Sequence, residues 1–257
     1  KGLEFIKKKN FQSAEKIFSK ILGKFPNHLN SLFLMGYALY EQKKYIKSLK
    51  HLTKASSFKK NFRDADYFVG KIYLNTKQFK KAKEQFNKIL KEYSNDLETL
   101  INLIVSKINL REFSDVEFLL KNNKKLFKND GVYENLYGLL YLYSGENDLS
   151  IKYYLESFKQ NNNNLNTLIN LAYIYLRVSD FYNSKKYFKK ALDLNPKNPN
   201  TLYAYSYFQL YSGEIKDGLI NYEQRKSVYN YNQNLFNNYN EWNGQNLDGK
   251  TILILSE

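Results

Sequence analysis

Small residues recur along this chain at a fixed interval of 34 residues. Seven positions form one arithmetic series, and all but one hold Gly, Ala or Ser: Gly2, Gly36, Gly70, Ile104, Gly138, Ala172 and Ser206. Glycine accounts for only 11 of the 257 residues, so chance does not explain four glycines in this short series. We call these seven the reference positions. A period of 34 with a small residue in each interval is the sequence signature of stacked helix-turn-helix units.

Two further columns keep the same period, one of small and one of large side chains. The residues 12 places after the reference positions are small apart from one valine: Ala14, Ser48, Ala82, Val116, Ser150, Ser184 and Gly218. The residues 16 places after them are large: Phe18, Leu52, Phe86, Leu120, Tyr154, Phe188 and Tyr222. Two antiparallel helices approach closely only where a side chain is small, and a bulky neighbour then fills the space beside it. The columns therefore predict the contact between the two helices of each unit.

The period predicts seven helix pairs separated by short turns. Turn-forming residues mark the boundaries, as at Pro26-Asn27 and at Asn195-Pro196-Lys197. The expected pairs span about residues 1–24, 30–58, 63–92, 97–128, 131–160, 165–194 and 199–228. The fourth pair departs from the pattern, with Ile104 and Val116 in the small columns and Asn123 where an apolar residue is usual. We expect altered packing there, either as a hinge or as drift in a tolerant scaffold, with drift favoured.

The pattern resembles the tetratricopeptide repeat. The resemblance rests on L-x-x-M-G-x-x-L from Leu32 to Leu39, on A-x-x-x-F at Ala14 and Ala82, and on the closing prolines Pro26 and Pro196. It covers Lys1 to about Arg225. It implies an all-α fold, a right-handed solenoid superhelix of 34-residue repeats, in which residues 1–228 hold one partial and six full repeats.

The repeats contain no recognisable catalytic or cofactor-binding pattern. Cys is absent, which excludes disulfides and thiolate metal sites. The two histidines, His28 and His51, fit no metal-ligand or nucleophile-base pattern. No uncharged apolar stretch reaches the roughly 18 residues that a membrane span needs. We therefore expect no catalytic residue, cofactor, metal or membrane span in the repeats.

The net charge of +15 is a weak argument for nucleic-acid binding. A basic surface attracts phosphate, but the lysines are scattered over the expected helix surfaces instead of forming one block. Lys, Asn, Ile and Tyr are also over-used together, as in residues 229–240, which is typical of a codon bias across a whole proteome. We do not expect a nucleic-acid partner.

A repeat superhelix can present its inner face, built by the first helix of each pair, to an extended protein or peptide. The candidate groove residues lie on these first helices and are rich in Tyr, which offers contact area and a hydroxyl. They are Phe33, Tyr37, Tyr67, Lys71, Asn102, Asn135, Asn170, Tyr173, Tyr203 and Tyr207. The Lys and Asn clamp with which tetratricopeptide co-chaperones hold a C-terminal carboxylate is absent, so we do not expect a chaperone-tail adaptor.

Two asparagines of this set carry a further resemblance. Asn102 and Asn170 lie in identical Leu-Ile-Asn-Leu segments, 100–103 and 168–171. These are similar to the asparagine ladder of the O-linked N-acetylglucosamine transferases, whose amides hold the main chain of a protein substrate. The resemblance implies a solvent-accessible amide at each position; the alternative is coincidence in an Asn-rich chain.

The chain changes character after about Arg225. Residues 229–250 form a polar, aromatic connector that contains the single Trp, Trp242. Residues 251–257 read TILILSE, and a bounded aliphatic run of this kind is typical of a strand buried on both faces. Such a strand needs partners on both edges. We therefore expect residues 251–257 to begin an α/β, Rossmann-like domain whose remainder lies beyond Glu257.

Two elements of this tail are similar to a junction in bacterial proteins that couple tetratricopeptide repeats to a glycosyltransferase of the two-Rossmann-domain type. They are Tyr-Glu-x-Arg at 222–225 and W-x-G-x-x-L-x-G-K-T from Trp242 to Thr251. The resemblance implies a recognition arm that docks a glycan-acceptor protein, with the sugar-nucleotide site outside this sequence. The alternative is a non-enzymatic scaffold or adaptor that assembles a multiprotein complex. The donor sugar, the acceptor and the compartment stay open, with the cytoplasm favoured.

Overall fold

In a computed structural model of the chain, the residues described are 1–59, 62–128 and 130–229. Within these ranges all regular structure is helical. In chain order the helices are α1 (Gly2–Lys7), α2 (Phe11–Lys24), α3 (Leu29–Glu41), α4 (Tyr45–Phe58), α5 (Arg63–Asn75), α6 (Phe79–Glu92), α7 (Leu97–Asn109), α8 (Phe113–Asn122), the 3₁₀ turn η1 (Lys124–Leu126), α9 (Val132–Ser144), α10 (Asn147–Gln160), α11 (Leu165–Arg177), α12 (Phe181–Leu194), α13 (Pro199–Tyr211), α14 (Ile215–Tyr222) and α15 (Arg225–Tyr229).

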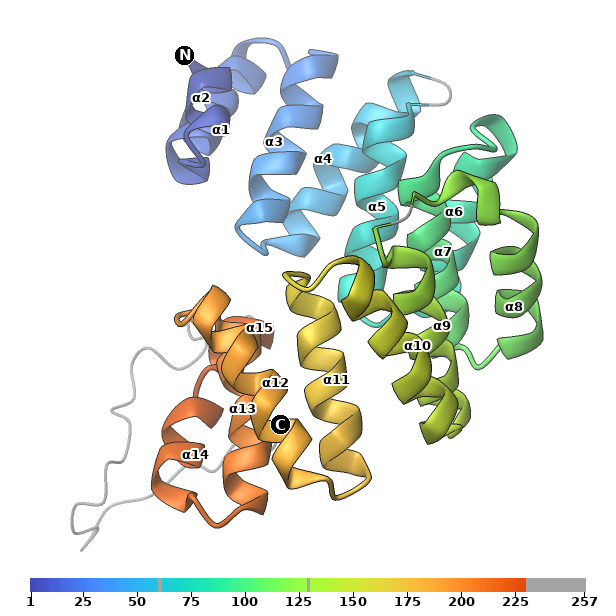
Figure 1. The fold of residues 1–257 in the computed structure, drawn as a ribbon. Helices are drawn as coiled ribbons and strands as arrows, with labels where there is room; N and C mark the ends of the chain where they lie inside the picture. The colour runs from blue at the N-terminus through green and yellow to red at the C-terminus, as the bar shows by residue number, and fades with distance from the viewer. Residues whose placement is uncertain (60–61, 129, 230–257) are drawn as a thin grey trace, which may run out of the picture.

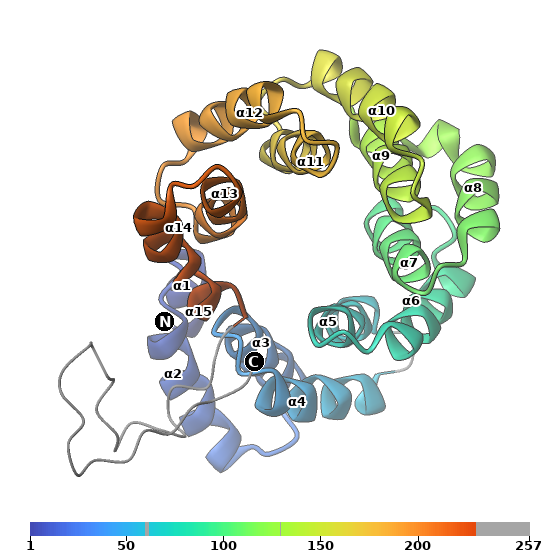
Figure 2. The ribbon, with the colours of Figure 1, turned by 90° about the horizontal axis from the view of Figure 1, so that it is seen from below.

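The helices form seven antiparallel pairs, which confirms the predicted helix-pair solenoid (Figure 1). Seen along its axis, the solenoid curves through almost a full turn (Figure 2), and its last helices lie below its first helices in the view of Figure 1. The first helices of the pairs, α3, α5, α7, α9, α11 and α13, line the inside of this ring, and their partners form the outside. The predicted connector (residues 229–250) and strand (251–257) lie outside the described residues, apart from Tyr229 at the end of α15.

The packing columns are confirmed by the distances between the helices of a pair. A Cβ added at Gly70 would lie 2.5 Å from the ring of Phe86, and one added at Gly138 would lie 2.5 Å from the ring of Tyr154. The small column also contributes hydrogen bonds, because Ser150 Oγ donates to the carbonyl of Gly138 at 2.9 Å. The glycines are therefore required by the close approach of the two helices, and the large residue 16 places on fills the space beside them.

A second feature repeats every 34 residues, at the turn inside each pair. The residue one or two places after each first helix has positive φ: Lys9, Lys43, Lys77, Arg111, Gly145, Ser179 and Gly213. The left-handed conformation costs a residue with a Cβ roughly 1–2 kcal/mol. Five of the seven turns have a residue other than glycine in this conformation. We infer that the packing of the helix pair imposes the turn geometry.

Side-chain caps begin several first helices. Asp96 accepts a hydrogen bond from the Thr99 N–H at the start of α7, and Asn164 accepts from the Asn166 and Thr167 N–H groups at the start of α11. These caps satisfy N–H groups that have no partner inside the helix. They fix where the first helix of a repeat begins.

The fourth pair is irregular, as the sequence predicts. Helix α8 has 10 residues, whereas α4, α6, α10 and α12 have 14 each, and η1 comes directly after it. Ile104 and Val116, which replace small residues, are both fully buried. The contact between α7 and α8 is smaller than the contact within the other full pairs.

The two ends of the turn touch each other. Lys43, at the turn between α3 and α4, donates from Nζ to the main-chain carbonyls of Ser227 and, at 3.3 Å, Val228 in α15. Helix α15 also packs against α13. It thus joins the last full pair of helices to the second one.

Candidate functional site: the inner face of the ring

Helix geometry defines which residues face the centre of the ring. On α11 the reference position Ala172 faces α12, since its carbonyl accepts a hydrogen bond from Ser184 Oγ at 2.9 Å. Successive residues of an α-helix turn by about 100°, so residues six and two before, and one and five after, the reference position lie on the opposite side. That side points inward, because α12 lies outside α11 (Figure 2). We call these four residues of each first helix its inner stripe.

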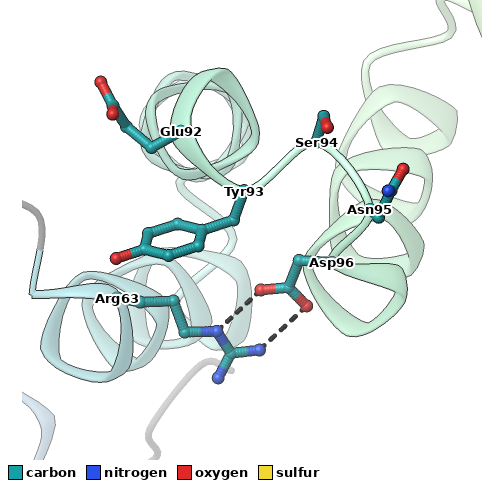
Figure 3. Close-up of a pocket in the computed structure, with 6 residues that line it drawn as sticks. All are labelled: Arg63, Glu92, Tyr93, Ser94, Asn95 and Asp96. Carbon is teal, nitrogen blue, oxygen red and sulfur yellow. Dashed lines mark hydrogen bonds and ion pairs between the residues drawn. The ribbon is translucent and has the colours of Figure 1, made fainter.

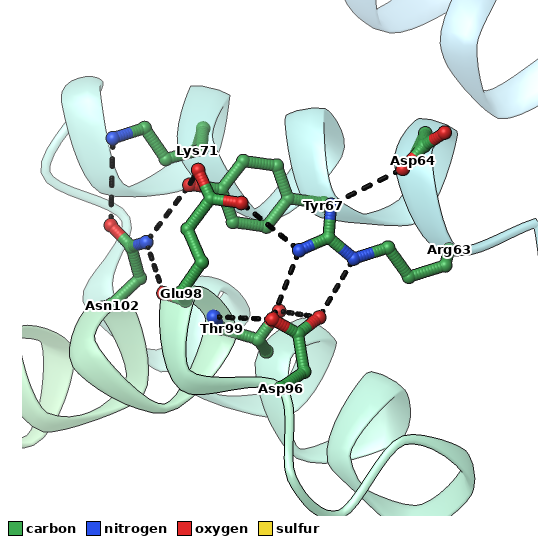
Figure 4. Close-up of polar contacts among 8 residues, drawn as sticks. All are labelled: Arg63, Asp64, Tyr67, Lys71, Asp96, Glu98, Thr99 and Asn102. Carbon is green, nitrogen blue, oxygen red and sulfur yellow. Dashed lines mark hydrogen bonds and ion pairs between the residues drawn. The ribbon is translucent and has the colours of Figure 1, made fainter. Parts of the chain in front are cut away.

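On α5 and α7 a charged network joins neighbouring repeats (Figure 4). Arg63 holds the Asp96 carboxylate with two hydrogen bonds, from Nε at 2.7 Å and from Nη2 at 3.0 Å, and also donates to Glu98 Oε2 at 3.0 Å. Burial raises the pKa of the Asp96 carboxyl, but hydrogen bonds from Arg63 and Thr99 outweigh it and the pKa is lowered. The guanidinium geometry suits a carboxylate held by two N–H groups.

The network continues toward the centre of the ring through Tyr67 and Asn102. Tyr67 Oη donates to Glu98 at 2.8 Å, and Asn102 Nδ2 donates to Tyr67 Oη at 3.1 Å and to the carbonyl of Glu98 at 2.7 Å. Lys71 Nζ reaches Asn102 Oδ1 at 3.5 Å. Burial, reinforced by the hydrogen bond to Glu98, raises the pKa of Tyr67, and burial lowers the pKa of Lys71.

This geometry corrects the expectation that Asn102 offers a solvent-accessible amide. Asn102 is 8% exposed and Tyr67 is 5% exposed. Both N–H groups of the Asn102 amide are already donated within the protein. The two side chains hold α5 against α7. Asn135 has a comparable contact, because its Nδ2 donates to Thr167 Oγ1 at 2.9 Å across α9 and α11.

The predicted aromatic residues of α3 pack onto the next repeat. The Phe33 ring lies 5.2 Å from that of Phe62, and the Tyr37 ring lies 5.1 Å from that of Phe68. Both are partly exposed. Such tilted pairs add to the apolar contact between repeats.

Among the predicted groove residues, Tyr173 on α11 is the one that is exposed. Tyr173 is 47% exposed, and the half-buried Asn170 side chain has no hydrogen-bond partner among the described residues. On α13, the Tyr203 and Tyr207 hydroxyls are 2.6 Å apart, and both rings contact Tyr222. The structure therefore leaves Asn170 and Tyr173 as the predicted groove residues with the most unused contact capacity. Their role in binding stays a prediction.

The inner stripes include a column of large, exposed side chains that was not among the predicted residues. It lies five places after the reference position and contains Tyr143 on α9, Arg177 on α11 and Tyr211 on α13. Tyr143 is 45% exposed, Tyr211 is 74% exposed, and Arg177 is exposed as well. The same period of 34 identifies this column in the sequence. In the structure this column stands out because its large side chains, at the last turn of the first helices, are exposed.

The excess positive charge lies on the outside of the ring. Helices α3, α5, α7, α9, α11 and α13 together carry four basic and five acidic side chains, whereas α2, α4, α6, α8, α10, α12 and α14 carry 19 and nine. The inner face is therefore close to neutral. A partner inside the ring is not selected by the net charge of the chain.

A shallow depression of about 550 Å³ opens beside the charged network (Figure 3). It is lined by Arg63 and by residues 92–96, which are the end of α6 and the turn between α6 and α7. Its one cation is held by Asp96, as Figure 3 shows. The depression is thus a consequence of the packing between repeats, and no cation without a partner lines it among the described residues.

The described residues contain no group of three His, Cys, Asp or Glu side chains that could hold a metal ion. In the same ranges no helix combines the length and hydrophobicity that a membrane crossing requires.

Comparison with known proteins agrees with the helical architecture. A family model described as "Tetratricopeptide repeat" matches residues 67–96 and 165–198. The chain is 27% identical over 246 residues to the TPR repeat-containing protein MJ1428 of Methanocaldococcus jannaschii, covering 89% of this chain and 42% of that protein. It is 22% identical over 240 residues to the human protein O-mannosyl-transferase TMTC3, covering 86% of this chain and 26% of that protein. The chain thus spans less than half of the length of both curated relatives.

Among solved structures, a tetratricopeptide repeat protein from Parabacteroides merdae has a similar fold. It superposes with a TM-score of 0.74 at 16% identity, and the match covers 92% of this chain and 93% of that one. Such low identity is evidence about the fold alone. The family match and the shared fold show a helical solenoid that contains tetratricopeptide repeats, matched at residues 67–96 and 165–198.

Proposed function

We propose that the chain is a protein-interaction module that binds an extended segment of another protein on its inner face, chiefly at α11 and α13. The observation that carries this proposal is the inner stripe of α11. There the Asn170 amide, which has no hydrogen-bond partner among the described residues, lies one helical turn from the half-exposed ring of Tyr173. An amide can donate to and accept from a peptide main chain, and a tyrosine ring offers contact area at low entropic cost.

The experiment places a photo-crosslinking amino acid at Tyr173 in the full chain and irradiates cells that express it. Tyr182 on the outer helix α12 is the matched control, because it is 80% exposed but lies on the other side of the repeat. We expect a discrete adduct from position 173 and none of the same size from position 182. Equal adducts from both positions would contradict binding on the inner face.

We propose, as a finer function, that this surface is the acceptor-recognition arm of a sugar-transferring protein. Two observations support it: the junction-like elements at 222–225 and 242–251, and the similarity to a protein named as an O-mannosyl-transferase over 240 residues. A scaffold of a multiprotein complex is the competing function. A scaffold would use the same inner face but would have no transferase domain C-terminal to the repeats.

The test is to read the gene beyond the codon for Glu257 and to assay its product for transfer of a radiolabelled sugar from nucleotide sugars. We expect an α/β domain and transfer by the full product, with none by residues 1–229. Further helical repeats or an immediate stop codon would favour the scaffold.

A further inference from the structure

Arg177 stands out on the inner face because most of its hydrogen-bonding capacity is unused. A guanidinium has five N–H donors. One nitrogen of Arg177, Nη1, donates to the carbonyl of Leu142 at 2.9 Å, near the C-terminal end of α9. Within the described residues no carboxylate pairs with it, and the side chain is exposed. The bond to Leu142 fixes the arginine between two repeats while the rest of the fork remains available.

The neighbours of Arg177 in the same column are aromatic. Tyr143 and Tyr211 occupy the equivalent positions on α9 and α13, the first helices on either side of α11, and Tyr173 lies one turn before Arg177 on α11 itself. All three rings are more than two-fifths exposed. A cation flanked by accessible aromatic rings suits a ligand with one anionic group and apolar groups on both sides.

The charged residues of the inner stripes differ between the two halves of the ring. On α9, α11 and α13, Arg177 is the only charged residue of the inner stripes. On α3, α5 and α7 the stripes instead carry three carboxylates and one ammonium: Glu41, Asp64, Glu98 and Lys71. Asp64 and Glu98 are already paired with Arg63, so the charge that distinguishes the two halves for a ligand is chiefly the Arg177 guanidinium, which attracts an acidic group to α11.

We propose that the inner face binds an extended peptide in which one internal Asp or Glu side chain pairs with Arg177 and apolar residues on either side contact Tyr143 and Tyr211. The Asn170 amide is placed to hold the main chain of the same peptide. This inference rests on the proposed protein-interaction function and specifies the chemistry of the partner.

The experiment selects binders from a library of random 12-residue peptides displayed internally, so that no peptide has a free C-terminus. The unmodified chain should enrich Asp or Glu at one fixed position, with aromatic or aliphatic residues beside it. The charge-reversed variant Arg177→Glu should enrich Lys or Arg at that position. Arg111→Glu is the matched control, since Arg111 is exposed in the α7–α8 turn; its selected peptides should keep the acidic residue.

The binding affinity of a synthetic peptide with the selected consensus sequence then measures how much the acidic residue contributes. Replacing its acidic residue by Asn should weaken binding about tenfold or more, as for a hydrogen bond to a charged group. Arg177→Gln should weaken the acidic peptide by a similar factor and leave the Asn peptide unchanged. Circular dichroism melting checks that each variant is folded.

The possible outcomes distinguish this inference from the broader protein-interaction function on which it rests. Binders without an acidic preference that are lost in an Asn170→Ala/Tyr173→Ala variant would refute the role of Arg177 and retain the interaction module. The same acidic preference in Arg177→Glu would also refute it. Failure to select any peptide, or preference only for a free C-terminal carboxylate in a second library, would overturn the proposal as well.

Discussion

The two halves of the inner face are built on the same kind of helices and use their polar side chains in opposite ways. Between α5 and α7, Arg63, Tyr67 and Asn102 direct their donors at neighbouring repeats, and little remains for a partner. On α11, Asn170 and Arg177 keep most of their donors available. A repeat frame can therefore use the same kind of residue for its own rigidity or for recognition, and the sequence position alone does not decide which.

The largest expected effect tests whether both halves share one frame. Gly70→Leu and Gly138→Leu should each destabilise the fold by about 2–3 kcal/mol, the upper range for an overpacked core, because even a Cβ would come within 2.5 Å of an aromatic ring. Denaturant unfolding measures the free energy. Gly23→Ala is the control, since nothing lies within 4 Å of the added Cβ, and it should be neutral or slightly stabilising. Loss in only one half would mean that the frame is not common to both.

The second prediction sets the paired asparagines against each other. Asn102→Ala should lower the free energy of unfolding by about 1–2 kcal/mol, because it removes hydrogen bonds to Tyr67 and to the Glu98 carbonyl and leaves buried groups without partners. Asn170→Ala should change it by less than about 0.5 kcal/mol. Equal changes in thermal and denaturant unfolding would remove the distinction between the two halves.

A smaller effect concerns pH, because α7 is capped by a carboxylate and α11 by an amide. Hydrogen bonds hold the folded pKa of Asp96 below its usual value of 3.8, so its contribution is present above that value and is lost as the pH falls through the folded pKa. The amide hydrogens at the start of α7 should therefore become less protected against exchange below about pH 4 than those of α11. The loss should be smaller than about 1 kcal/mol, the typical contribution of an N-cap.

The control for this prediction is Asp96→Asn, which keeps a capping acceptor but does not titrate. Its α7 should show the same pH response as α11. An equal loss of protection in both helices of the unmodified chain would assign the acid sensitivity to the whole fold instead of the cap.

The smallest effect concerns the turns that both halves share. Arg111→Gly and Ser179→Gly should each stabilise the protein by about 0.5 kcal/mol, because glycine relieves the left-handed conformation but costs some chain entropy. The two increments should be similar in thermal melts. A gain at one turn and a loss at the other would show that the turns differ between the halves.

The repeat frame could be predicted from the sequence because it depends on residues within one 34-residue unit. Small and large residues 16 places apart, such as Gly70 and Phe86, meet whatever the neighbouring repeats contain. The predicted helix pairs accordingly agree with the observed ones to within about two residues at most ends. The left-handed turns were less visible, since five of the seven lack glycine and are set by packing.

The use of the inner face could not be predicted in the same way, because it depends on pairs of residues across repeats. Asn102 and Asn170 occupy the same place in identical Leu-Ile-Asn-Leu segments. The residue one repeat earlier that faces Asn102 is Tyr67, whereas the equivalent residue before Asn170 is Asn135, which bonds instead to Thr167. Whether the amide is hydrogen-bonded within the protein therefore depends on the side chain that lies opposite it in the neighbouring repeat.

The contact between Lys43 and α15 changes the mechanics of the whole ring. An open solenoid behaves as a coil spring, in which small rotations between successive repeats add up from one end to the other. A contact between α15 and the second pair couples these rotations, so a twist in one repeat is favoured when the repeats between α3 and α15 compensate for it. The contact consists of side-chain hydrogen bonds from one lysine, each worth on the order of 1 kcal/mol, so it favours one curvature of the superhelix without fixing its diameter.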